Sequence, residues 1–164
     1  MTTAAVASPA KPFRTVLAGG LLAGALDITY ACINLGLKGR SPEWVLQTVA
    51  SGLLGKGAFE GGAGAGAAAL GALCHFFIAV TLAFIYYAAS GPLDLLVRRP
   101  VLCGLLYGVI AYFVMSFVVV PLSAAPFNFP FRPGVILPGL LVHMFLIGLP
   151  IALVVSRARR ARRS

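Results

Sequence analysis

Three ionisable side chains lie inside long apolar stretches of this sequence: Asp27, His75 and His143. Asp27 is the only charged residue between Thr15 and Leu37, and the chain has no further histidine. Carboxylates and imidazoles titrate and relay protons, whereas an ionised carboxylate in the middle of a membrane span costs roughly 2.5–3.5 kcal/mol on insertion scales. We therefore expect Asp27 to face other helices and to have hydrogen-bonding partners or a proton.

The sequence places these three groups at a similar depth. Asp27 lies ten residues before the end of its apolar stretch, and each histidine lies eight residues after the start of its own. At 1.5 Å per helical residue, all three are about 12–15 Å below the same surface. We therefore predict one intramembrane polar layer of Asp27, His75 and His143.

Three interpretations of this layer remain open. In the first, a histidine donates a hydrogen bond to Asp27, and this polar clasp fixes how the helices pack. In the second, the groups form a proton or solute pathway, because Asp and His cluster in transporters. In the third, the two histidines hold a haem, with Gly71 and Gly139 one turn earlier making room for it.

No enzyme signature accompanies the layer. The sequence has no G-x-S-x-G, no P-loop, no H-E-x-x-H and no paired carboxylates. We therefore expect no enzyme, no bound cofactor and no metal site. The favoured interpretation is a structural or interaction role organised by the polar layer.

The composition shows which elements must position these residues. Hydrophobic residues make up 60% of the 164, and only 10% are charged, against about 25% in soluble domains. We predict an all-α membrane domain over residues 15–156, between a disordered tail (1–14) and a basic tail (157–164). Its four spans are expected at residues 15–37, 67–90, 101–120 and 135–155, since about 20 residues cross a bilayer.

A fifth, shorter helix is predicted over residues 42–55. Ser41, Pro42 and Glu43 form a typical helix start: a cap, a proline in the first turn and an acidic residue there. About 13 residues are too few to span a bilayer, so this helix is expected at the membrane interface.

The two halves of the chain share sequence motifs. Gly20-Leu-Leu-Ala-Gly24 matches Gly104-Leu-Leu-Tyr-Gly108, and the residues around His75 match those around His143. The spans then form two hairpins related as a parallel repeat. Small residues four apart allow close helix approach, so these four glycines are expected to be packing positions.

The distribution of charge predicts the orientation. Nine of the thirteen basic residues fall on one side of the predicted bundle, and the other side has Lys38, Arg40, Lys56 and Arg132. By the positive-inside rule both termini are expected in the cytoplasm. Because the charges flank the spans, the expected partner is the lipid bilayer and not nucleic acid. A second copy of the chain or another membrane protein is left open as a partner.

Three segments carry a resemblance: LAGGLLAGALDITYACI, VLQTVASGLLGKGAFEGG and LGALCHFFIAVTLAFIYY. They resemble a family of small uncharacterised bacterial inner-membrane proteins and, more distantly, the YagU-like, DUF1440-type proteins. The resemblance covers residues 15–155. It implies a four-helix bacterial inner-membrane protein in which Asp27, Ser51–Gly55 and His75 belong to the pattern, and it implies no activity.

Overall fold

The computed structural model describes residues 10–60, 64–127 and 133–162. All regular secondary structure in these ranges is helical. In chain order the elements are α1 (Ala10–Gly36), α2 (Pro42–Leu54), the 3-10 turn η1 (Gly55–Phe59), α3 (Gly64–Ala89), α4 (Leu95–Arg98), α5 (Pro100–Val114), the π-helical η2 (Met115–Val119), α6 (Val120–Leu122), α7 (Pro133–Val142), the π-helical η3 (His143–Gly148) and α8 (Leu149–Arg160).

Four of the helices described are long and apolar enough to cross a membrane. They cover Pro12–Gly36, Gly64–Ala89, Pro100–Leu122 and Pro133–Arg160, and the last two are each built from consecutive helical elements. The predicted all-α membrane fold with four spans is therefore confirmed.

The helices extend further than the sequence predicted at both ends of the domain. Residues 10–14, expected in the disordered tail, form the start of α1, because Pro12 lies in the first turn where its missing N–H costs nothing. Residues 1–9 lie outside the described residues. At the other end, α8 continues to Arg160, so the first part of the predicted basic tail is helical.

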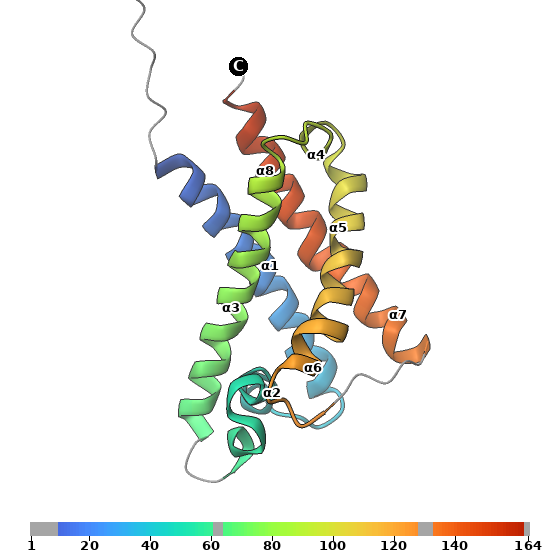
Figure 1. The fold of residues 1–164 in the computed structure, drawn as a ribbon. Coiled ribbons are helices and arrows are strands. Elements are labelled where there is room, and N and C mark those ends of the chain that lie inside the picture. The colour runs from blue at the N-terminus through green and yellow to red at the C-terminus, as the bar shows by residue number, and fades with distance from the viewer. Residues whose placement is uncertain (1–9, 61–63, 128–132, 163–164) are drawn as a thin grey trace, which may run out of the picture.

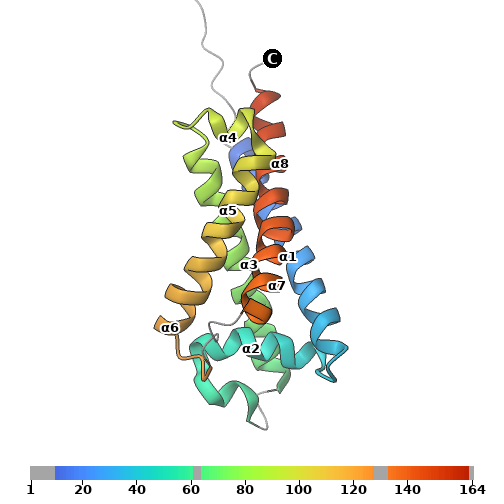
Figure 2. The ribbon, with the colours of Figure 1, turned by 90° about the vertical axis from the view of Figure 1, so that its right-hand side faces the viewer.

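The spans run between two distinct ends of the molecule (Figures 1 and 2). At one end α1 begins, α8 ends and α4 connects α3 to α5; we call this the arginine end, after Arg98, Arg99, Arg159 and Arg160. At the opposite end α2 lies across the bundle, nearly perpendicular to the spans, and we call this the α2 end.

Glycines set the closest helix contacts in both hairpins. A Cβ on Gly20 would lie 2.5 Å from the Cα of Val80, so α1 and α3 approach backbone to backbone. Gly108 of α5 meets the backbone of His143 and Met144 in the same way. Gly24 and Gly104 lie one turn away at the same two contacts. Each G-L-L-x-G motif thus packs its helix against the second helix of its own hairpin.

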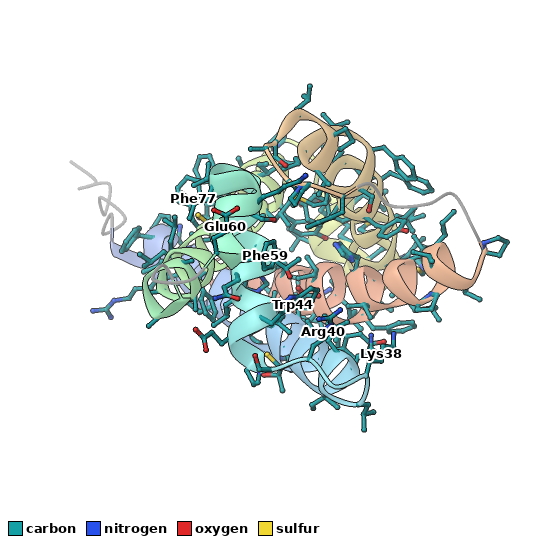
Figure 3. The ribbon with its side chains drawn as sticks, turned by 90° about the horizontal axis from the view of Figure 1, so that it is seen from below. Lys38, Arg40, Trp44, Phe59, Glu60 and Phe77 are labelled. Carbon is teal, nitrogen blue, oxygen red and sulfur yellow. The ribbon has the colours of Figure 1, made fainter. Side chains whose placement is uncertain are left out.

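The α2 helix begins as its sequence indicates. The Ser41 hydroxyl accepts a hydrogen bond from the backbone N–H of Trp44 at 3.1 Å, and Pro42 occupies the first turn. A Cβ on Gly71 of α3 would overlap the carbonyl of Leu46, so α2 is pressed closely onto α3. Seen from the α2 end, the helix crosses the bundle with Trp44 and Arg40 toward its first half (Figure 3).

Two π-helical segments interrupt the last two spans. Met115–Val119 ends two residues before Pro121, and His143–Gly148 ends two residues before Pro150. A proline ring clashes with the carbonyl four residues earlier and has no N–H to offer it, and a widened turn relieves that conflict. The second segment begins at His143. The widened turn before Pro150 therefore affects the direction in which the His143 side chain points.

At the arginine end, arginines of α8 bind carbonyls that the other helices leave open. Arg159 donates hydrogen bonds to the carbonyl of Tyr87 (2.9 Å) and the hydroxyl of Ser90 (3.2 Å), and its guanidinium stacks 4.1 Å from the Tyr87 ring centroid. Arg160 donates to the carbonyl of Val97 at 2.9 Å. A cation at a helix C-terminus satisfies its last carbonyls and its dipole. These arginines therefore hold the ends of α3 and α4 together.

We predict that Arg159→Gln lowers the free energy of unfolding by about 1–3 kcal/mol, because it removes two hydrogen bonds and a cation–π contact. Thermal unfolding of the detergent-solubilised chain measures the change. Arg157→Gln is the matched control, since Arg157 is exposed and one charge is lost in both variants. Equal melting temperatures for the two variants would show that Arg159 acts only as a surface charge.

Candidate functional site

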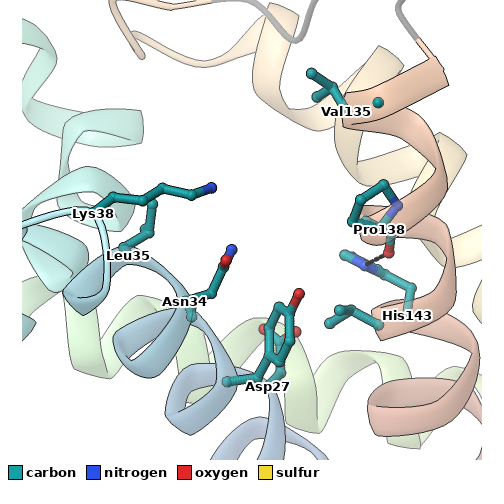
Figure 4. Close-up of a pocket in the computed structure, with 12 residues that line it drawn as sticks. Asp27, Asn34, Leu35, Lys38, Val135, Pro138 and His143 are labelled. Carbon is teal, nitrogen blue, oxygen red and sulfur yellow. Dashed lines mark hydrogen bonds between the residues drawn. The ribbon is translucent and has the colours of Figure 1, made fainter.

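Asp27 lies beside a cavity of about 520 Å³ between α1 and α7. Figure 4 shows Asp27, Asn34 and Lys38 on the α1 side of this cavity, facing Val135, Pro138 and His143 on the other side. We call it the polar cavity. The described residues that line it are Asp27, Tyr30, Ala31, Asn34, Leu35, Lys38, Gly134, Val135, Pro138, Gly139, Val142 and His143.

The polar cavity runs from the α2 end toward the middle of the membrane. Asp27 and Asn34 are seven residues apart on α1, so they lie along one helix face. At 1.5 Å rise, the Cα of Asp27 is about 14 Å along the helix from that of Gly36, the last residue of α1. Lys38, just beyond the end of α1, thus marks the mouth, and Asp27 lies deep inside.

A second, smaller cavity of about 120 Å³ brings all three predicted groups together. Asp27, His75 and His143 line it with apolar side chains of α2, α3, η2 and η3: Val49, Ile78, Ala79, Leu82, Met115 and Ile147. Asp27 and His143 line both cavities. The three ionisable groups from three spans therefore border one space in the bundle.

The histidines do not form the hydrogen bond to Asp27 that the clasp interpretation expects. His75 donates from Nε2 to the backbone carbonyl of Gly24 at 2.9 Å, and His143 donates from Nδ1 to the carbonyl of Gly139 at 2.9 Å. Carbonyl oxygens only accept, so these contacts define which ring nitrogens carry a proton. Both acceptors are carbonyls of glycines, Gly24 and Gly139, where no Cβ shields the backbone. The imidazoles therefore bind these carbonyls and not the carboxylate.

Asp27 itself is partly buried and forms no hydrogen bond or ion pair within the described part of the chain. A carboxylate placed in an apolar span without such a partner needs a proton, a cation, water or a ligand. Tyr30, about one helical turn after Asp27, lines the polar cavity but makes no hydrogen bond to Asp27 in this structure.

The two histidines do not fit a bis-histidine haem in this arrangement. The cavity that both imidazoles line is about 120 Å³, which is smaller than a porphyrin ring, and each imidazole already binds a backbone carbonyl. The interpretation as a haem site expects Gly71 and Gly139 to leave room for the macrocycle. In the structure the backbone of Leu46 in α2 packs against Gly71, and the ring of Tyr112 packs against Gly139.

A packed core separates the cavities from the arginine end. Val16, Ala23, Ala83, Ile151 and Val155 are buried there together with the ring of Tyr86. The hydroxyl of Tyr107 bonds the carbonyl of Leu82 at 2.7 Å, which ties α5 to α3. The lining of the polar cavity thus extends toward the α2 end, and the packed core closes the cavity toward the arginine end.

Comparison of the chain with protein families, with curated proteins and with solved structures finds no match. The resemblance to the YagU-like membrane proteins therefore stays a prediction.

Proposed function

We propose that this protein is a small proton-linked transporter, in which Asp27 takes up and releases a proton at the base of the polar cavity. The observation that carries the proposal is the Asp27 carboxyl group, which has no hydrogen-bond or ion-pair partner among the described residues and lies deep in a span, on the wall of a cavity whose lining reaches Lys38 at the α2 end. A merely structural clasp has less support, because both histidines donate their hydrogen bonds to backbone carbonyls and not to the Asp27 carboxyl group.

The groups around Asp27 suit proton exchange. Tyr30 and Lys38 come from the α1 side, His143 faces them from η3, and His75 reaches the smaller cavity from α3. The ring nitrogen of each histidine that binds no carbonyl remains for exchange with a proton on Asp27 or on water. The closed arginine end prevents an open leak, so passage requires a change of conformation.

The orientation and membrane are part of the same proposal. The arginine end holds Arg14, Arg98, Arg99 and the α8 arginines, whereas the α2 end holds Lys38, Arg40 and Lys56 among the described residues. The positive-inside rule then places the arginine end in the cytoplasm and opens the polar cavity to the outside. A bacterial inner membrane fits this orientation and the resemblance in the sequence.

A proton-flux assay on the full chain in liposomes tests the proposal. A potassium diffusion potential, negative inside, drives protons inward, and a trapped pH-sensitive dye reports them. We expect Asp27→Asn to reduce this flux at least about tenfold, because the amide carries no exchangeable acid proton. Glu60→Gln is the matched control, since Glu60 is exposed at the α2 end and loses the same charge. No flux in the parent protein, or full flux in Asp27→Asn, would overturn the proposal.

A further inference from the structure

A third cavity lies directly beside the polar cavity. It has a volume of about 450 Å³ and is lined by Tyr30, Leu137, Pro138, Leu141, Val142, Phe145 and Leu146. Tyr30, Pro138 and Val142 line the polar cavity as well. The two spaces therefore share a wall, and we call the third one the lateral groove.

The lateral groove faces the lipid. Leu137, Leu141 and Phe145 expose 57%, 44% and 49% of their surface, and all three lie in the fourth span. In a membrane this surface meets acyl chains rather than water. An apolar groove open to lipid thus adjoins a polar cavity whose carboxyl group has no partner within the part of the chain that the structure describes.

We propose that this pair of cavities binds an amphiphilic amine, with its ammonium group at Asp27 and its hydrocarbon tail in the lateral groove. The inference rests on the proposed function and names its substrate class. The carboxylate supplies the charge that an ammonium group needs, and Asn34 and Tyr30 supply further polar atoms near it. The groove supplies apolar surface for the tail at the same depth.

The positions of the charges favour access from the lipid side. A cation that approaches through the aqueous mouth passes the Lys38 ammonium group, which repels it. None of the described residues that line the lateral groove is charged, so an amine that partitions into the bilayer reaches Asp27 without that barrier. An anionic amphiphile would instead meet the Asp27 carboxylate at the base of the site.

Protection from a lipophilic carbodiimide tests this inference on the full chain in lipid nanodiscs. The reagent modifies protonated carboxyl groups in apolar surroundings, and mass spectrometry locates the label. We expect dodecyltrimethylammonium, whose quaternary nitrogen cannot couple to the activated carboxyl group, to protect Asp27 at concentrations at least about tenfold lower than dodecanol, which has the same tail length and no charge. The protection should weaken as the pH is lowered, since the ammonium group and the proton compete for one carboxylate.

Two variants distinguish binding in the lateral groove from a general effect of the amphiphile on the bilayer. Leu141→Trp fills the lateral groove and is expected to weaken protection by dodecyltrimethylammonium at least about tenfold. Leu73→Trp is the matched control, because Leu73 is 71% exposed on α3 and lines neither cavity. Equal protection by dodecanol, or equal loss in both variants, overturns the inference. The transport proposal would still be supported in that case if the proton flux depends on Asp27. Protection of Asp27 without any proton flux would instead reject the transport proposal.

Discussion

Gly108→Ala is expected to lower the free energy of unfolding by at least about 2 kcal/mol, although it adds a single methyl group. The new Cβ would lie 2.5 Å from the Cα of Met144 and would overlap the carbonyl of His143. Both are backbone atoms, so no side-chain rotation relieves the contact. α5 and the π-helical segment η3 must therefore move apart at this contact.

Gly66→Ala is the matched control for this effect. Gly66 also lies in a spanning helix, but a Cβ there meets nothing within 4 Å. Alanine is the better helix former, so this variant should keep or raise stability, by no more than about 1 kcal/mol. Unfolding in mixed detergent and denaturant measures both variants. A similar change in both would show that close packing at Gly108 contributes little.

The sequence was sufficient to predict the four spans and the short helix, and the reason lies in particular residues. Unbroken apolar runs between the charged flanks define the spans, and Ser41 and Pro42 define where α2 begins. The helix ends were less predictable. Arg159 and Arg160 bind carbonyls of residues 72 and 63 positions earlier in the chain, and such contacts depend on the tertiary arrangement.

For the site, counting residues along each helix predicts Asp27, His75 and His143 at one depth, and all three line one cavity in the structure. Counting could not indicate the hydrogen-bond partners. The spacing says nothing about which backbone carbonyls become accessible, and this accessibility at Gly24 and Gly139 decides where the imidazoles turn. The π-helical turn at His143 was also missed, although Pro150 was the available signal.

The role of Asp27 leads to the second large effect: Asp27→Leu is expected to increase stability and to abolish proton flux. A carboxyl group without a hydrogen bond in a span costs stability, by up to about 3 kcal/mol when ionised. Leucine removes that cost and packs against the apolar walls of both cavities. A residue that destabilises the fold in this way is typical of a site kept for function.

Thermal unfolding and the liposome flux assay together decide between function and packing for Asp27. Glu60→Leu controls for a gain in hydrophobicity at an exposed acid, and it should change neither quantity appreciably. A clasp predicts the opposite sign, because removing the acid would break contacts that hold three helices. Lower stability of Asp27→Leu would therefore assign the carboxyl group to helix packing. Higher stability of Asp27→Leu together with loss of proton flux would assign the carboxyl group to proton exchange.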